Sequence, residues 1–365
     1  MEFMVHFSEV TDPRQAKNQK YSFESLMLIA FSSIISGCES VEEINLFAKT
    51  KLDWLRKFVE LPGVPCVETL RYFICAVNPN ELSACFQSFA QQHNVKGQGD
   101  HLAIDGKTMR GSKNKDEGAI HLFSVWSRTH GITLSMLESE GKKNEIKTIP
   151  KILDSVDIEG ATVSLDAMGC QKAIATKIIE KKGDYVLQLK GNQGSLLEQV
   201  EAFYHLQVRE NFKGLGHEVF EEADKGHGRL ELRTYTHFSI TDWVEGAEKW
   251  TGLKSIIRAC RVRESDDKRQ EEVSWYISSP DIDAKKCSTV VRDHWSVENQ
   301  LHWRLDVVFH EDKCAIHSAH GAKNMGIIKR YCMNLLSQDT TVKRMKHRLK
   351  VAAMDDSYRE RVLFG

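Results

Sequence analysis

The sequence lacks the features of a membrane, secreted or disulfide-bonded protein. Its 365 residues contain no run of about 20 apolar residues, so no membrane span is expected. The N-terminal segment MEFMVHFSEV lacks the basic and then apolar order of a signal peptide. Nine cysteines are scattered without a CxxC pair, which argues against a zinc knuckle or a disulfide framework and predicts free core thiols. We therefore expect a cytoplasmic protein.

A strong excess of charge of either sign is also absent. The net charge of −1 does not by itself indicate a nucleic-acid partner. The charge is segregated, however, because residues 321–365 hold 10 Lys and Arg against 4 Asp and Glu. This segment thus carries +6 and the remainder −7, so a basic face can lie beside an acidic site. A solvated amphipathic helix is the alternative for KRMKHRLK.

Residues 1–96 are expected to form an N-terminal helical domain. Ser40 and Glu43 have the spacing of a capping box that opens one helix, and Asn78 with Pro79 opens another, ELSACFQSFAQQ. Between them lie a Pro/Gly break, a short helix and a tight turn. Two interpretations stay open: a helix-turn-helix that docks on DNA, or the simple packing of short helices.

A change to strand patterns marks the expected catalytic core, residues 97–192. Three runs, LAID, IHLFSVWS and ITLSMLES, precede a helix, the strand TVSLD, a second helix and the strand DYVLQLK. This order suits an antiparallel meander followed by parallel crossovers, as in the ribonuclease H-like α/β fold, a mixed sheet flanked by helices. In that fold the first and fourth strands are neighbours, which would place Asp105 and Asp166 side by side.

Three further regions follow along the chain. Residues 193–286 begin as a helix and then alternate like strands, which predicts a β-rich insertion. Residues 287–320 hold a helix that carries Glu298 and completes the core. Residues 321–365 are expected to form a basic helical C-terminus.

The stretch VRDHWSVENQLHWRLDVVFHED carries the third candidate acid, Glu298. Projected as a helix at about 100° per residue, it places Glu298 inside a stripe of Val291, His294, Trp295, Leu301, His302 and Leu305. A carboxylate aimed inward needs a cation or a proton, because burying it unpaired is costly. Asp105, Asp166 and Glu298 together would suit two Mg²⁺ or Mn²⁺ ions, which prefer oxygen ligands.

Several segments resemble the transposases of the H-repeat-associated, ISAs-type insertion sequences. They are AIDGKTMRGS, NEIKTIPKIL, DAMGCQKAIATKI, DYVLQLKGNQ, HGRLELR and HWSVENQLHWRLDVVFHED, and the resemblance covers nearly the whole chain. It implies that Asp105, Asp166 and Glu298 form the DDE triad, on a ribonuclease H-like core with an inserted β domain. It also implies double-stranded DNA as substrate and two subunits that pair the element ends. His294 and Leu305 stand where the wider DDE class often has Arg and Lys, so those roles do not carry over.

Further residues are candidates for contact with DNA. Two basic residues directly after Asp105 could hold phosphates, although a surface turn fits them equally well. A loop after the last core strand is expected to face the same cleft, and basic residues of the insertion are added as candidates. The set is Lys107, Arg110, Lys190, Asn192, Gln193, His227, Arg229 and Arg233.

Two tryptophans flank Glu298 on the same predicted helix. The projection puts Trp295 and Trp303 on different faces. We expect Trp295 to pack in the core and Trp303 to be free to stack on a displaced base.

We predict a transposase that cuts at the ends of its own insertion element and transfers the freed 3′-hydroxyl to target DNA. Three alternatives stay open. His294, Glu298 and His302, spaced i, i+4 and i+8, could bind zinc in an unrelated hydrolase. The chain could also be a transposase-derived DNA-binding protein that no longer cuts, or a ribonuclease H-like nuclease without strand transfer.

Overall fold

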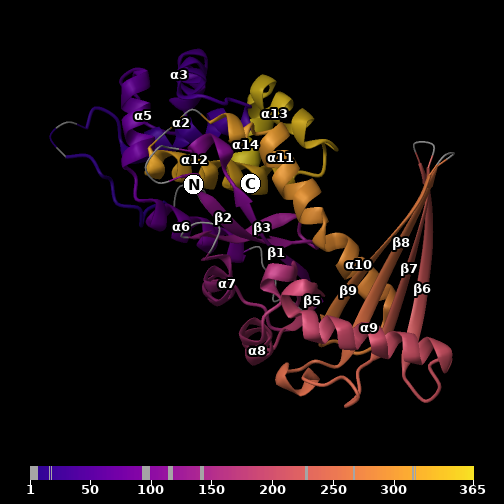
Figure 1. Cartoon of the computed structure of the whole chain (residues 1–365). Helices are drawn as coiled ribbons and strands as arrows, with labels where there is room; N and C mark the ends of the chain where they lie inside the picture. The colour runs from indigo at the N-terminus through magenta and orange to yellow at the C-terminus, as the bar shows by residue number, and fades with distance from the viewer. Residues whose placement is uncertain are drawn as a thin grey trace.

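A central sheet separates a helical lobe from the helices on its other face in the computed structural model (Figure 1). The residues described are 7–15, 17, 19–92, 99–113, 118–139, 144–226, 229–265, 268–314, 316 and 318–365, without the side chains of 226, 229, 265 and 268.

The described strands form one mixed sheet in the order β3-β2-β1-β4-β5-β9-β8-β7-β6. β1 pairs antiparallel with β2 and parallel with β4, while β5 is parallel to β4 and antiparallel to β9. The predicted adjacency of the first and fourth strands is therefore confirmed. The bounds are β1 (His101–Thr108), β2 (His121–Ser127), β3 (Ile132–Ser139), β4 (Thr162–Leu165), β5 (Asp184–Leu189), β6 (His217–Gly226), β7 (Arg229–Ser239), β8 (Ser255–Ser265) and β9 (Lys268–Ser278).

The core strands are buried on both faces, which explains their almost continuous apolar runs. Successive residues of a strand point to opposite sides of the sheet. Leu102 and Ile104 therefore join one hydrophobic core, while Ala103 between them joins the other. Helices α7 (Glu145–Asp154) and α8 (Lys172–Glu180) cover the first face through buried isoleucines, each of which stabilises the fold by about 1.5–3 kcal/mol.

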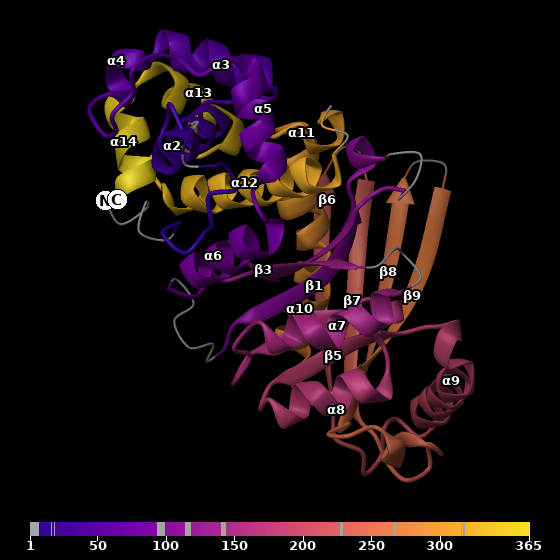
Figure 2. The same cartoon turned by 90° about the vertical axis from the view of Figure 1, so that its left-hand side faces the viewer.

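Helices from the N-terminal and the C-terminal parts of the chain together build the helical lobe on the second face (Figure 2). Phe31 and Tyr331 illustrate the shared core, with ring centroids 5.0 Å apart. The predicted N-terminal helical region and the basic C-terminus thus pack around one core. The helices are α2 (Phe23–Ile35), α3 (Val41–Thr50), α4 (Leu52–Leu55), α5 (Val67–Ala76), α6 (Pro79–Gln92), α12 (Ala319–Gln338), α13 (Met345–Met354) and α14 (Asp356–Phe364).

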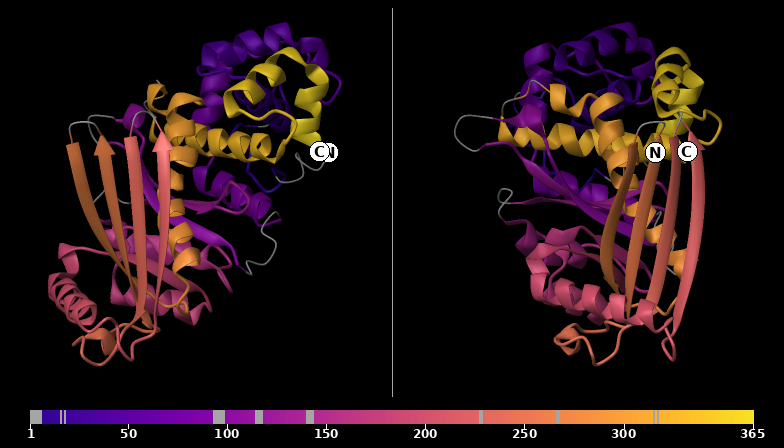
Figure 3. Two further views of the ribbon diagram at one scale, coloured as in Figure 1. Left: turned by 90° about the vertical axis from the view of Figure 1, so that its right-hand side faces the viewer. Right: turned by 45° about the vertical axis from the view of Figure 1, so that its right-hand side comes forward.

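The predicted insertion consists of helix α9 (Gly194–Arg209) and two long hairpins, β6–β7 and β8–β9. It continues the core sheet, because β9 pairs directly with β5. Helix α10 (Ala284–His294) lies across the same sheet face as the lobe, next to the projecting hairpins (Figure 3). Val290 and Val291 of α10 pack there against Tyr235 and Tyr276.

Two expectations concerned the cysteines and a membrane span. The nine cysteines are free thiols, as expected, but Cys66 is exposed, so the prediction of core positions holds only in part. No helix in the described part of the chain combines the length and the apolar character needed to cross a membrane.

Candidate active site

Asp105 and Asp166 follow paired positions of two parallel strands. Ile104 of β1 is in register with Leu165 of β4, and each aspartate comes next in its chain. Since neighbouring strands run about 4.8 Å apart, this register sets the two aspartates side by side. Asp166 caps the short helix η4 (Ala167–Gly169), where its Oδ1 accepts hydrogen bonds from the backbone N–H groups of Met168 and Gly169 at 3.1 and 3.3 Å.

Glu298 reaches this strand end from the segment that follows α10. The chain passes through a π-helical segment, η7 (Val297–His302), and then into α11 (Trp303–Val307). Oxygen atoms of Asp105 and Glu298 and a ring nitrogen of His302 all lie within 4.8 Å of one another. The helix and the strand end are therefore close enough to share one cation.

Electrostatic coupling ties the three acids together. Burial raises the pKa of Asp105 to about 6; the charges of Asp166 and Glu298 push in the same direction, and His302 opposes them. A hydrogen bond from His302 lowers the pKa of Glu298 below its ordinary value. A divalent cation bound here would stabilise the ionised form of Asp105, which burial and the two neighbouring acids disfavour.

The predicted inward orientation of Glu298 is wrong, and so is the core position of Trp295. The side chain of Glu298 is 63% exposed, and Trp295 and Trp303 are 57% and 54% exposed. The helical projection assumed a constant α-helical rotation. Glu298 lies inside the π-helical segment, whose i→i+5 bonds put more residues in each turn and so change the direction of this side chain. Trp295 precedes the segment, and its side chain borders the hollow beside the hairpins instead of the core.

The helical zinc face is not assembled. Nδ1 of His294 lies 2.9 Å from Oγ of Ser164, which in turn lies 2.7 Å from Nε2 of His101. Burial lowers the pKa of His294 to about 4. Within the described residues, the metal-capable group around Glu298 contains Asp105 and His302 but not His294.

Asn192 and Gln193 lie beside Asp166, as the strand order predicts. The Asn192 amide donates to the carbonyl of Ala167 at 2.6 Å, and the Gln193 amide donates to that of Cys170 at 3.0 Å. Both side chains therefore brace the loop after Asp166. Lys190, just before them, is exposed.

Lys107 does not take the predicted phosphate-binding position, nor does it lie in a surface turn. It is 6% exposed, and its Nζ lies 2.7 Å from Asp306, 3.0 Å from Glu311 and 3.3 Å from Asp312. Glu311 also pairs with Arg330, and both side chains of that pair are fully buried. Lys107 thus ties β1 to the chain beyond Glu298. We missed this ion cluster because charged residues usually lie at the surface.

The remaining candidates divide by exposure. The Arg110 side chain is 86% exposed, and its Nε lies 3.9 Å from the carboxylate of Asp312, which is a long distance for an ion pair. Arg233 is largely covered and paired with Glu222 and Glu231. Arg229 begins β7, but its side chain is outside the described part, as is all of His227.

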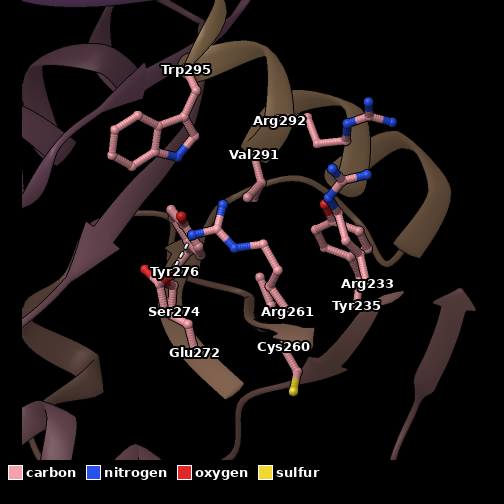
Figure 4. Close-up of a pocket in the computed structure, with 11 residues that line it drawn as sticks. Arg233, Tyr235, Cys260, Arg261, Glu272, Ser274, Tyr276, Val291, Arg292 and Trp295 are labelled. Atoms are coloured by element: carbon pink, nitrogen blue, oxygen red, sulfur yellow. Dashed lines mark hydrogen bonds and ion pairs between the residues drawn. The ribbon is translucent and has the colours of Figure 1, made fainter. Parts of the chain in front are cut away.

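A small hollow lies between the hairpins and α10, about one helical turn before Glu298 (Figure 4). Trp295 borders it, and the Trp295 indole hydrogen-bonds to Tyr276. Its three arginines are all paired: Arg261 with Glu272, Arg292 with Glu222, and Arg233 with Glu222 and Glu231. The hollow is therefore close to neutral in charge.

The described α/β fold brings three acids together from two adjacent strand ends and the segment that follows α10. The Transposase DDE domain model matches residues 96–335, and the DDE_Tnp_1-associated model matches residues 4–90. The chain belongs to the DDE transposase family, among the H repeat-associated transposases.

Full-length relatives agree with this assignment. The Escherichia coli K12 proteins "Putative protein YbfL" and "H repeat-associated putative transposase YhhI" are 36% and 35% identical, each over 99% of this chain and 97% of its own length. "Putative transposase YncI" of Escherichia coli O157:H7 is 35% identical over 98% and 93%. A solved piggyBac transposase synaptic complex with hairpin DNA aligns at 12% identity with a TM-score of 0.46, covering 100% of this chain and 80% of that one.

Proposed function

We propose that this chain is a DNA transposase that cuts phosphodiester bonds at the ends of its own element and joins the freed 3′-hydroxyl to target DNA. The observation that carries the proposal is the meeting of Asp105, Asp166 and Glu298 at one edge of a ribonuclease H-like strand arrangement. The alternative of a helical zinc site lacks His294 as a neighbour of Glu298.

The three acids are proposed as ligands of two Mg²⁺ or Mn²⁺ ions. When bound, such ions activate an attacking water or hydroxyl and stabilise the leaving oxygen. The chain's own part is positional: β1 and β4 hold Asp105 and Asp166 in fixed register, and the cap of η4 orients Asp166. The carboxylate oxygens are the ligand type that these ions prefer.

Double-stranded DNA is proposed to lie across the exposed side of this edge. Arg110 and Lys190 offer exposed cations on the segments that follow β1 and β5, and Trp303 offers an exposed ring. Arg348 of α13 lies near Arg304 of α11, since its charge adds to the effect of burial in lowering the pKa of Arg304. Two subunits are proposed to pair two element ends.

The test uses the full chain with labelled duplexes that carry the DNA directly flanking its coding sequence. In Mg²⁺ the wild-type protein should cut at element ends and join them to a supercoiled plasmid. Asp105→Asn, Asp166→Asn and Glu298→Gln should each lower cleavage by about a thousandfold or more while leaving DNA binding intact. Asp53→Asn, at a fully exposed position in the helical lobe, is the matched control and should leave cleavage unchanged.

The assay also separates the alternatives. Cleavage without joined product would indicate a nuclease, and specific end binding without cleavage would indicate a DNA-binding protein. Cleavage that persists in Asp105→Asn would contradict the proposed site.

A further inference from the structure

His302 lies between two of the three acids of the candidate site. Its Nδ1 is 2.9 Å from Oε2 of Glu298 and 3.5 Å from Oδ2 of Asp105. The imidazole is almost fully buried, at 4% side-chain exposure, whereas Glu298 is largely exposed. A glutamate side chain in that position can adopt several rotamers unless another group holds it.

Of the two ring nitrogens of His302, only Nδ1 has a hydrogen-bond partner among the described residues. An ionised carboxylate only accepts, so the Nδ1–H of His302 donates to Glu298, and Oδ2 of Asp105 lies 3.5 Å from the same nitrogen. The other ring nitrogen, Nε2, is buried and has no hydrogen-bond partner among the described residues. All polar contacts of the imidazole are therefore made toward the acids.

The contacts leave room for a cation. His302 occupies Oε2 of Glu298, so Oε1 is left for another ligand. Oδ1 of Asp105 accepts from the backbone N–H of Gly106 at 2.9 Å, while Oδ2 faces His302 and the candidate site. The imidazole can thus orient both carboxylates without using every oxygen.

We propose that His302 is a positioning residue that holds Glu298 against Asp105, so that metal ions meet acids already arranged to receive them. The inference deepens the proposed function and rests on it. Hydrogen-bond partners that orient metal ligands typically change metal affinity by about 10- to 100-fold.

The experiment measures Mn²⁺ binding to the full chain by isothermal titration calorimetry. The His302→Asn variant keeps an amide N–H as many bonds from Cα as Nδ1 is, whereas His302→Leu keeps much of the bulk without a donor. His302→Asn should bind Mn²⁺ within about threefold of wild type, and His302→Leu should bind about 10- to 100-fold more weakly. Asn299→Ala, at an exposed position in the same segment, is the control and should bind like wild type.

Other outcomes overturn the inference. Tighter binding by His302→Leu would make the imidazole a competitor of the metal, and equal weakening of both variants would make it a direct ligand. No change in His302→Leu would make it a bystander. If thermal unfolding shows that His302→Leu does not fold, His302→Gln, whose amide lies one bond farther out, takes its place with the same expected weakening. Failure of the wild-type protein to bind Mn²⁺ would instead refute the proposed metal site.

Discussion

The buried ion cluster beneath the candidate site tests how the fold holds Asp105 and Glu298 together. Arg330 and Glu311 are fully buried and hydrogen-bonded to each other, and Lys107 approaches Glu311 at 3.0 Å. Burial alone would raise the pKa of Glu311, but Arg330 and Lys107 reverse this and lower it below its ordinary value. We choose Arg330→Met, which removes the guanidinium and keeps much of the side-chain volume.

The expected loss in the free energy of unfolding depends on the charges that remain around Glu311 in the variant. Removing one partner of a buried ion pair destabilises a protein by about 3–5 kcal/mol. Lys107 still faces Glu311 in the variant, so we expect the lower end, about 3 kcal/mol. At about 1.3 °C for each kcal/mol in a chain of this size, the Tm should fall by about 4 °C. Adding Glu311→Gln removes the stranded charge and should recover at least half of that loss.

Thermal unfolding followed by circular dichroism at pH 7 measures the effect. Arg344→Met, at an exposed position before α13, is the matched control and should leave the Tm unchanged. Because a lowered carboxyl pKa stabilises only while the group is ionised, the gap between wild type and Arg330→Met should shrink as pH falls through the folded pKa of Glu311. A Tm for Arg330→Met within about 1 °C of wild type, or no recovery in the double variant, would refute the reasoning.

Three further predictions concern the site and its surface. The pKa of Asp105 is raised to about 6. Mn²⁺ affinity measured by calorimetry should therefore fall about tenfold per pH unit below pH 6, where the ion must displace a proton. An affinity that stays constant as pH falls below 6 would contradict this. Arg110→Ala should weaken binding to duplex DNA and lower the slope of log affinity against log salt by about one, without changing the Tm; an unchanged slope would remove Arg110 from the interface. Trp303→Ala should weaken the binding of single-stranded DNA, measured by fluorescence anisotropy, by about 1–3 kcal/mol, while Trp303→Phe should retain it. The control is Trp243→Ala, which removes an exposed tryptophan beside α9. An equal loss of binding in this control would show that stacking near the site is not the cause.

The strand order and the pairing of Asp105 with Asp166 could be predicted from the sequence. The apolar runs are short and separated by turn residues, and the two crossovers through α7 and α8 force the later strands to be parallel. The cap at Ser40 was also predictable, because the N–H of Glu43 donates to its hydroxyl at 3.2 Å. These features depend on local patterns and on general rules of chain connection.

The ion cluster could not be predicted in the same way. Lys107 and Arg330 are far apart in the sequence, and a local pattern assigns both to the surface. Their burial depends on Glu311, which the fold brings between them. Only the tertiary arrangement shows that these charges compensate one another.

The helical projection of the Glu298 segment predicted most of its buried face. Leu301, His302 and Leu305 are buried as the stripe predicted, and Trp303 is exposed. Glu298 departs from the projection inside the π-helical segment, whose wider turns leave no clear mark in the sequence. Trp295 precedes that segment, and its side chain borders the hollow beside the hairpins, a tertiary neighbour that a helical projection does not include.

The continuity of the sheet has a mechanical consequence for the site. β9 is bonded to β5 on one side and leads along the chain into α10, which carries the chain to Glu298. Arg292 of α10 also pairs with Glu222 of β6 at 2.8 Å, so the helix is tied to the outermost strand as well. A displacement of the hairpins would therefore also displace α10, because main-chain hydrogen bonds and this ion pair connect them. Only the short connection of residues 279–283 separates β9 from α10, so the position of the hairpins is coupled closely to that of the helix leading to Glu298.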